Sequence, residues 1–259
     1  MADRPLHGVG VLVTRPRTQA IELVDAIEAQ GGTAYCLPVI DIAPLDELEV
    51  RTAAKALGAP DIVIFISRNA VEYGIDYAAS GKVAAIGPAT AKAIEAAGRI
   101  VDIQSTAGYD SEHLLAEPPL RDVAGKHVRI IRGSAGRERL ANELRARGAK
   151  VDYLSVYERH LPAISADTLA DLESRWRQHQ ITVITIMSVQ SLVNLIKLLP
   201  AWCCRQLEST PLVTPAGRVL KEAMDRYPAC RPILAAGPGA DDMVRAIIAL
   251  QSTDSGIAS

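Results

Sequence analysis

The sequence is poor in aromatic residues and has no long apolar segment. Its 259 residues include one Phe and two Trp, so Ala, Ile, Leu and Val must form most of the core. No apolar run approaches the roughly 18 residues that a membrane-spanning helix needs. Residues 1–5 are not followed by the apolar stretch of a secretion signal. We therefore expect a cytoplasmic protein that does not enter a membrane.

Motifs typical of metal or nucleotide sites are also absent. The four cysteines form neither a CxxC pair nor a Cys/His cluster with zinc spacing, and the five histidines are scattered singly. Gly8-Val9-Gly10 precedes its predicted strand, whereas a dinucleotide-binding glycine motif follows one. The chain has no P-loop and no GxSxG elbow. The sequence predicts neither a metal site nor a bound cofactor.

Charge is balanced overall but uneven locally. The formal charge of −2 gives no reason to expect a nucleic-acid partner. Residues 121–150 contain nine basic and three acidic residues, and most of these arginines fit solvent-exposed helix faces. Arg132 differs because it ends a predicted strand beside Gly133, as Arg15 does near the start of the chain. Both arginines are therefore candidates for binding an anion.

Short β-rich segments alternate with Ala-rich helical segments along nearly the whole chain. The predicted strands are residues 9–14, 33–39, 62–66, 83–86, 100–103, 128–131, 150–156, 181–187, 211–213 and 232–235. Helical patterns between them cover residues 46–57, 69–79, 89–97, 110–117, 137–147, 166–178, 189–206, 216–226 and 240–251. Such alternation is typical of parallel sheets covered by helices on both faces. We predict an α/β fold.

The first helix is predicted between Pro16 and the glycine pair Gly31-Gly32. Proline is favoured in the first turn of a helix, and glycine is favoured just past its end. Within this segment Ile21, Val24 and Ile27 recur at helical spacing. We predict that these three side chains form its buried face.

The chain also repeats itself with a period of about half its length. The strand–helix–strand start of each repeat is carried by residues 11–15 and 31–34, and by residues 130–132 and 148–151. Later matches join residues 65–67 to 186–188 and, more loosely, 85–88 to 212–215. Such a period indicates two related α/β domains rather than a solenoid. Taken alone, the repeat predicts two consecutive halves that meet near residue 120.

Small polar residues follow several predicted strands. They are Thr14-Arg15, Ser67-Arg68-Asn69, Gly87-Pro88-Ala89-Thr90, Arg132-Gly133-Ser134 and Ser188. In doubly wound sheets this edge carries helix N-termini, whose free N–H groups bind anions. Ser, Thr and Asn also cap helices whatever the function, so each position alone is better explained as a cap. Five such positions on one edge favour an anion-binding cleft.

Five segments have a characteristic order and spacing. They are residues 11–16, 65–71, 85–91, 131–138, and 148–151 leading into Val156-Tyr157-Glu158-Arg159. Together they resemble the uroporphyrinogen-III synthase family, and the resemblance runs from about residue 9 to 250. The chain departs from the family at Val213-Thr214-Pro215-Ala216-Gly217, where many members repeat an Ile-Gly-x-x-Thr turn.

The resemblance implies two flavodoxin-like parallel-sheet domains joined by a two-stranded linker, with a cleft between them. The chain would start in one domain, cross to the second and return. Carried over to this sequence, domain one comprises residues 1–37 and 163–259, and domain two comprises residues 44–155. The linker strands would then be residues 38–43 and 156–162.

The resemblance also implies a cofactor-free lyase of tetrapyrrole biosynthesis. Its substrate would be hydroxymethylbilane, four linked pyrroles that bear eight carboxylates. The enzyme closes this chain to uroporphyrinogen III, with loss of water and inversion of ring D through a spiro intermediate. By the same resemblance the protein would be a monomer that receives its substrate from the preceding pathway enzyme, with no nucleic-acid or membrane partner.

Site residues follow from the family motifs. The family's best candidate for assisting departure of the hydroxyl is a Tyr in the strand entering the linker, here Tyr157; the alternative is that Tyr157 only packs there. The substrate-binding candidates are Thr14, Arg15, Ser67, Thr90, Arg132, Gly133 and Ser188. We expect the remaining tyrosines to be structural: Tyr35, Tyr73, Tyr77, Tyr109, Tyr153 and Tyr227.

Two other classes of protein share this kind of fold. A non-catalytic two-lobed binder of a small polycarboxylate would have the same domains and cleft. A sugar-nucleotide or NAD enzyme would need a phosphate-binding loop, which the sequence lacks. The binder stays the main alternative.

Overall fold

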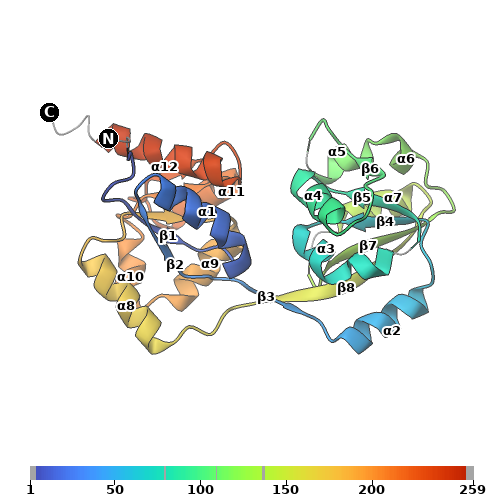
Figure 1. Cartoon of the computed structure of the whole chain (residues 1–259), viewed down its shortest axis with the longest axis horizontal. Helices are drawn as coiled ribbons and strands as arrows, with labels where there is room; N and C mark the ends of the chain where they lie inside the picture. The colour runs from blue at the N-terminus through green and yellow to red at the C-terminus, as the bar shows by residue number, and fades with distance from the viewer. Residues whose placement is uncertain (1–3, 79, 109, 136–137, 255–259) are drawn as a thin grey trace. The chain divides into compact units, whose positions relative to one another are not determined.

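The computed structural model describes residues 4–78, 80–108, 110–135 and 138–254 (Figure 1). The chain divides into two compact units. Unit 1 contains the chain up to Asp41 and from His160 onward, and unit 2 is Ile42–Arg159. Each unit has its own sheet and its own core.

Unit 1 is a five-stranded sheet covered on both faces. Its strand order is β11 (Pro232–Leu234), β10 (Leu212–Thr214), β9 (Val183–Thr185), β1 (Gly10–Val13) and β2 (Thr33–Cys36), with parallel pairing throughout. Helices α1 (Arg17–Ala29) and α12 (Ala240–Asp254) contribute to the core on one face. The core on the other face is built from α8 (Ala166–Arg177), α9 (Val189–Leu198), α10 (Ala201–Gln206) and α11 (Gly217–Arg226).

Unit 2 has a six-stranded sheet. Its order is β3 (Asp41–Pro44), β8 (Lys150–His160), β7 (His127–Gly133), β4 (Ile62–Phe65), β5 (Lys82–Ala85) and β6 (Ile103–Gln104). One core contains side chains of α2 (Glu47–Leu57), α3 (Arg68–Gly74), the short 3₁₀ helix η1 (Ile75–Ala78) and α4 (Pro88–Ala96). The opposite core contains side chains of α5 (Ser111–Leu115), α6 (Pro118–Arg121) and α7 (Arg139–Ala146). The predicted parallel α/β fold is confirmed.

The strand order confirms the internal repeat and shows that each sheet combines strands from both copies. The first repeat supplies β1, β2, β4, β5 and β6, and the second supplies β7 to β11. Each sheet takes the first two strands of one repeat and the last three of the other, and both read 2-1-3-4-5 in repeat numbering. This is the flavodoxin order. The division into two consecutive halves near residue 120 is therefore wrong, because the repeats are interleaved.

Strands β3 and β8 are neighbours at one edge of the unit 2 sheet (Figure 1). Strand β8 is longer than the predicted 150–156 and continues to His160. The backbone N–H of Leu45, just after β3, donates to the carbonyl of Val156 at 3.1 Å. One boundary between the two units falls at the start of β3, and the other falls at the end of β8.

The buried face of α1 differs from the predicted one. Ala20, Leu23 and Ile27 are buried, whereas Ile21 is 59% exposed. The buried set has i, i+3, i+7 spacing, and all three of its side chains belong to one core of unit 1. Of the predicted face only Ile27 is fully buried, with Val24 packed at its margin.

The helices differ from the sequence prediction in two places. The segment 189–206 forms two helices, α9 and α10, separated at Pro200, because proline has no N–H to donate within a helix. The short helix α6 is an element that the sequence pattern does not predict. No helix in the described part of the chain combines the length and apolarity that crossing a membrane requires.

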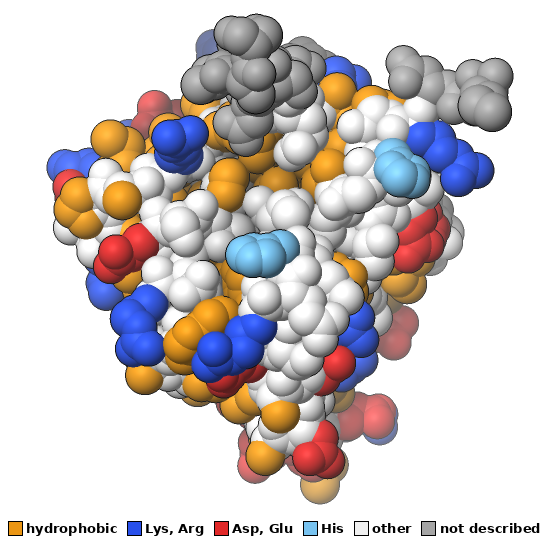
Figure 2. Space-filling view, turned by 90° about the vertical axis from the view of Figure 1, so that its left-hand side faces the viewer, with side chains coloured by type: hydrophobic (Ala, Val, Ile, Leu, Met, Phe, Trp, Pro, Cys, Tyr) orange, Lys and Arg blue, Asp and Glu red, His pale blue; other side chains and the backbone are white. Residues whose placement is uncertain are grey.

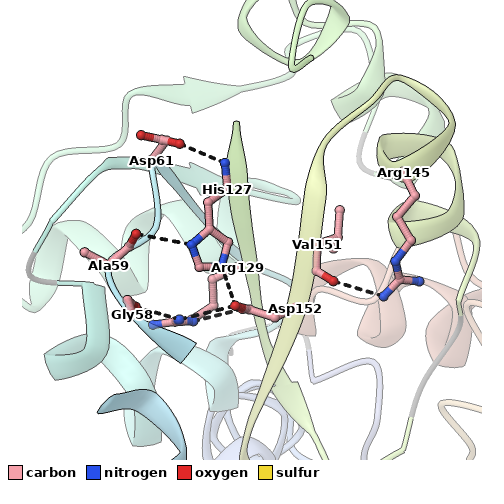
Figure 3. Close-up of polar contacts among 8 residues, drawn as sticks. All are labelled: Gly58, Ala59, Asp61, His127, Arg129, Arg145, Val151 and Asp152. Carbon is pink, nitrogen blue, oxygen red and sulfur yellow. Dashed lines mark hydrogen bonds and ion pairs between the residues drawn. The ribbon is translucent and has the colours of Figure 1, made fainter. Parts of the chain in front are cut away.

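A largely buried cluster of polar side chains connects the amino ends of β7 and β8 through hydrogen bonds and ion pairs (Figure 3). Arg129 is 2% exposed and donates to Asp152 at 3.0 Å and to the carbonyl of Gly58 at 2.8 Å. The His127 ring pairs with the same Asp152 carboxylate, and its backbone N–H donates to Asp61 at 2.7 Å. Arg129 therefore belongs to the interior of unit 2, not to a solvent-exposed helix face.

Candidate functional site

The sheet topology marks one point in each unit where a ligand is expected. In doubly wound sheets, ligands bind outside the carboxyl ends of the strands where the strand order reverses. In unit 1 this point lies between β1 and β9, and in unit 2 it lies between β7 and β4. The predicted site residues lie in the carboxyl-terminal part of these strands and their neighbours, or just after them.

In unit 1, Thr14 joins the ends of the two central strands. Its hydroxyl donates to the carbonyl of Thr185 at 2.6 Å, and the Thr185 hydroxyl donates to the carbonyl of Leu12 at 3.2 Å. Thr14 is 1% exposed. Its hydroxyl proton is donated to the Thr185 carbonyl within the sheet, so toward a ligand the hydroxyl oxygen could act only as a hydrogen-bond acceptor.

Arg15, the next residue, is also largely buried. One of its terminal nitrogens, Nη2, donates to the carbonyl of Pro238 at 2.6 Å. Pro238 lies in the loop between β11 and α12. In the structure Arg15 therefore connects two loops on the carboxyl edge of the unit 1 sheet.

Ser188 and Thr214 are two further polar residues on this edge. Ser188 caps α9, because its Oγ accepts from the backbone N–H of Ser191 at 3.1 Å. Thr214 ends β10 and is fully buried, and its Oγ1 accepts from the backbone N–H of Ala216 at 3.2 Å. The turn that departs from the family pattern therefore still places a threonine oxygen on the carboxyl edge.

In unit 2, Ser67 and Tyr157 come together. Ser67 follows β4 and caps α3, with its Oγ accepting from the backbone N–H of Ala70 at 3.0 Å. The Tyr157 hydroxyl lies 3.2 Å from the same Oγ. These residues are 90 positions apart in the chain, and they meet at the carboxyl edge of the unit 2 sheet.

Gly133 makes this contact possible. Strand β7 lies between β8, which carries Tyr157, and β4, which Ser67 follows. A Cβ atom at Gly133 would lie 2.8 Å from Cε2 and 2.9 Å from Cζ of Tyr157, closer than carbon atoms approach without displacement. The missing side chain at the end of β7 therefore lets the phenol cross that strand and reach Ser67.

Two further side chains contact Tyr157. The ring of Tyr73 lies against the Tyr157 ring with centroids 6.1 Å apart and a tilt of 41°. The Arg159 guanidinium lies 5.7 Å from the centre of the Tyr157 ring, and its Nη2 is 3.4 Å from the phenol oxygen. Tyr157 itself is 2% exposed, so its ring is fixed by neighbours on several sides.

Arg132 belongs to a second cluster at the same sheet edge. It is 5% exposed, donates to Glu138 at 3.2 Å, and lies 4.5 Å above the centre of the Tyr153 ring. Tyr153 donates to the other Glu138 oxygen at 2.6 Å. This hydrogen bond, more than the charge of Arg132, lowers the pKa of the Glu138 carboxyl, while burial raises the pKa of Tyr153.

The Arg132 cluster borders a cavity of about 370 Å³. Its lining combines aliphatic side chains of the sheet and α7 with polar groups of β7, β8, α5 and α7. The lining residues are Ile66, Ile86, Asp110, Ser111, Glu112, Ile130, Arg132, Arg139, Leu140 and Tyr153. The two arginines of the lining, Arg132 and Arg139, pair with Glu138 and Glu112, so the cavity offers a ligand both apolar surface and charged groups.

Thr90 lies on the same edge, in the first turn of α4. It is 4% exposed, and its backbone N–H donates to the carbonyl of Gly87 at 3.1 Å. Of the unit 2 candidates, direct contacts join Ser67, Gly133 and Tyr157, and Arg132 bonds to the Gly133 carbonyl at 3.3 Å. Thr90 is placed separately, by the loop after β5.

Sequence analysis missed the contacts that surround the predicted residues. Arg159 stands in a family motif two positions after Tyr157, the spacing that places side chains on the same face of a strand, and this signal could have paired them. Tyr73, expected to be structural, packs on Tyr157. Tyr109 is outside the described residues. Within the described ranges no cluster of three or more His, Cys, Asp or Glu residues could hold a metal ion.

Figure 2 shows one face of the molecule. Basic and acidic side chains are interspersed over the part of this face that the structure describes, and the histidines on it stand apart from one another.

Comparison with known proteins gives a consistent result. The sequence pattern of the family described as "Uroporphyrinogen-III synthase HemD" matches residues 21–245. The uroporphyrinogen-III synthase of Escherichia coli K12 is 31% identical over 203 residues, which cover 75% of this chain and 81% of that protein. The Salmonella typhimurium LT2 enzyme of the same name is 31% identical over 204 residues, with the same two coverages of 75% and 81%.

Solved structures show the same fold at low sequence identity. A mutant uroporphyrinogen III synthase from the extremely thermophilic bacterium Thermus thermophilus is 18% identical, with a TM-score of 0.61 over 94% of this chain and 99% of that one. The uroporphyrinogen-III synthetase of Helicobacter pylori 26695 is 14% identical, with a TM-score of 0.62 over 93% and 99%. Because a family pattern covers most of the chain and relatives match it over three quarters of its length, the chain belongs to the uroporphyrinogen-III synthase family.

Proposed function

We propose that this protein is a uroporphyrinogen-III synthase, a lyase that closes hydroxymethylbilane to uroporphyrinogen III. The observation that carries the proposal is the family match over residues 21–245, together with relatives of that name that are 31% identical over most of both chains. The polar carboxyl edges of the two sheets support it, because they offer hydroxyl, guanidinium and backbone N–H groups to a substrate with many carboxylates.

The enzyme has to control which carbon of ring D forms the new bond, more than it has to activate the leaving hydroxyl. The terminal hydroxyl of the substrate leaves with help from its own pyrrole nitrogen, and the resulting cation can close on ring D at two positions. Closure at the free carbon gives the type I isomer. Closure at the substituted carbon, through a spiro intermediate, gives type III. An enzyme achieves the second by holding the chain in one conformation, a contribution of orientation.

Tyr157 is proposed to assist the leaving group. Its phenol would give a proton to the departing hydroxyl while the carbon–oxygen bond breaks, so that water leaves, and it would then recover a proton from solvent. A phenol can donate a hydrogen bond while it is neutral near pH 7. The contact with Ser67 and the burial of the ring support this role, because a donor must be fixed in direction.

The remaining candidates are proposed to bind substrate carboxylates and hydroxyls. Arg132 and the adjacent cavity would take an acid-bearing pyrrole, supported by the apolar and charged lining. Ser67 and Thr90 would act from helix N-termini on the same edge, and Gly133 would offer its backbone beside them. From unit 1 we assign Arg15 and Ser188 to the same task, and Thr14 to accepting a hydrogen bond from a substrate hydroxyl or N–H.

We also propose that units 1 and 2 correspond to the two flavodoxin-like domains of the family, and that β3 with the end of β8 forms the linker. The 2-1-3-4-5 order of each sheet and the β3–β8 pairing support this assignment. Each domain would then offer the carboxyl edge of its own sheet to the substrate. The boundaries would be residues 1–37 with 163–259, and 44–155.

The test is to supply the purified protein with freshly generated hydroxymethylbilane and to separate the product isomers after oxidation. We expect the type III isomer to dominate, and the type I isomer to form after heat inactivation. A folded protein that leaves only type I would reject the proposed function and favour the alternative, a non-catalytic binder of a small polycarboxylate.

A further inference from the structure

We propose that Ser67 is a positioning residue that acts through Tyr157, and that the hydrogen-bonded pair presents one hydroxyl proton to the substrate. The inference rests on the proposed function, in which Tyr157 supplies the proton. It changes the role of Ser67 from an independent substrate contact to a part of the acid.

Each oxygen of the pair already accepts one hydrogen bond from outside the pair. Ser67 Oγ accepts from the backbone N–H of Ala70 at 3.0 Å, and the Tyr157 oxygen accepts from Arg159 Nη2 at 3.4 Å. The two oxygens are 3.2 Å apart, so one of their two protons lies between them. In the arrangement proposed, Ser67 donates to the phenol oxygen, so the Tyr157 proton is the one left to point away from the pair.

The phenol cannot easily turn to choose another partner. Its ring is 2% exposed, lies against Tyr73, and passes over Gly133 where no side chain could fit. Ser67 is also held in place, because it caps α3 one residue after a buried strand ends. The direction of the remaining proton is therefore set by Ser67, which is anchored in turn on Ala70.

The pair also balances the proton transfer. One proton passes to the leaving hydroxyl oxygen, the carbon–oxygen bond breaks, and water departs. The oxygen left without a proton stays hydrogen-bonded to the other hydroxyl, and the Arg159 guanidinium remains beside the phenol. A proton from solvent restores the pair, so the protein ends the step in the state in which it began.

A double-mutant cycle tests the proposal, with the rate of type III formation as the readout. The proteins are wild type, Ser67→Ala, Tyr157→Phe and the double variant. We expect Ser67→Ala to lower kcat by roughly three- to tenfold with little change in KM, the loss that one neutral hydrogen bond implies. In the Tyr157→Phe background the same change should lower kcat by less than about twofold, because the partner hydroxyl is already gone.

Three further variants separate positioning from folding. Ser67→Thr keeps the hydroxyl and should restore most of the rate. Ser67→Gly removes the hydroxyl but is a tolerated cap, so it should be as slow as Ser67→Ala and provides the test if the alanine variant unfolds. Ser165→Ala removes a matched serine cap, that of α8, whose Oγ accepts from Thr168 N–H at 3.2 Å, and should leave kcat unchanged.

Two results would overturn the inference. One is an equal loss from Ser67→Ala in both backgrounds, above all as a rise in KM, which would make Ser67 an independent substrate contact. The other is a folded Ser67→Gly protein with wild-type kcat. Failure of the proposed function looks different, because wild-type protein would then give only the spontaneous type I isomer.

Discussion

At the scale of single residues, one glycine decides where a buried tyrosine can reach. Strand β7 separates the strand of Tyr157 from the loop of Ser67, and only the absence of a side chain at Gly133 opens the path between them. A buried phenol needs a polar partner at its tip whatever its role. The hydroxyl of Tyr157 meets two, Ser67 and Arg159, and these contacts fix its direction, which a proton donor also requires.

The first prediction follows for Tyr157→Phe. The ring fills the same space, so the fold should be retained and the loss confined to turnover. A well-placed general acid contributes about 10²–10⁴-fold, and because the substrate assists its own leaving group we expect about 100-fold. The measurement is kcat for type III formation, with circular dichroism as the control for folding. A loss below about tenfold would assign Tyr157 to packing.

At the scale of elements, helix α1 shows how a plausible apolar pattern can be misread. Two overlapping sets of aliphatic residues have helical spacing, and the structure buries the set that contains Leu23 instead of Ile21. Replacing a fully buried leucine by alanine costs about 2–5 kcal/mol, whereas an exposed isoleucine can be truncated at a cost within about 0.5 kcal/mol.

We therefore expect Leu23→Ala to lower the free energy of unfolding strongly and Ile21→Ala to leave it almost unchanged. The two variants sit in the same helix and serve as controls for each other. Urea denaturation followed by circular dichroism measures both. Equal losses, or a larger loss from Ile21→Ala, would restore the face predicted from the sequence.

The amino ends of β7 and β8 carry the second stability prediction. Arg129→Met would leave the Asp152 carboxylate largely buried with His127 as its remaining side-chain partner (Figure 3). Breaking a buried pair costs about 3–5 kcal/mol, and we expect the lower end because His127 stays. Arg145→Ala is the control, since this exposed arginine donates to the carbonyl of Val151 at 3.1 Å on the surface and should cost at most about 1 kcal/mol.

The double variant Arg129→Met with Asp152→Leu sharpens the comparison. It removes the stranded carboxylate together with its partner, and should therefore be more stable than Arg129→Met alone. If the double variant is less stable than the single one, the cost lies in lost packing and not in an unpaired charge. If Arg129→Met costs no more than Arg145→Ala, the cluster does not stabilise unit 2.

Elements with a strong local signal are predictable from the sequence, and their long-range contacts are not. Apolar segments such as Ile62–Phe65 are found because a strand buried on both faces must be continuously apolar. Pro200 marks a helix break that apolar periodicity alone passes over. Helix capping by Ser67 and Ser188 depends only on neighbouring residues, so the sequence predicts it as the alternative to ligand binding at these positions. The Ser67–Tyr157 contact is not predictable in this way, because it depends on the order of three strands and on the space above Gly133.

At the scale of the whole molecule, the interleaved repeat explains why the sequence alone divides the chain wrongly. A repeat in sequence shows which segments are alike but not which strands pair. Strand β1 therefore resembles β7 in sequence, yet it pairs with β9 from the other repeat. The alternation of strands and helices predicts the class of fold, whereas the crossing and return of the chain follow only from the family resemblance.

The central claim is that this protein directs ring closure, and one titration tests it most directly. A fixed amount of fresh hydroxymethylbilane is allowed to react with increasing protein, without nucleotide and with a chelator present, and the fraction of type III isomer is measured. Because the enzyme competes with spontaneous closure, we predict that this fraction rises from near zero to near one, and that Tyr157→Phe moves the midpoint to higher protein concentration. A type III fraction that stays at the spontaneous level at every concentration of folded protein would contradict the account.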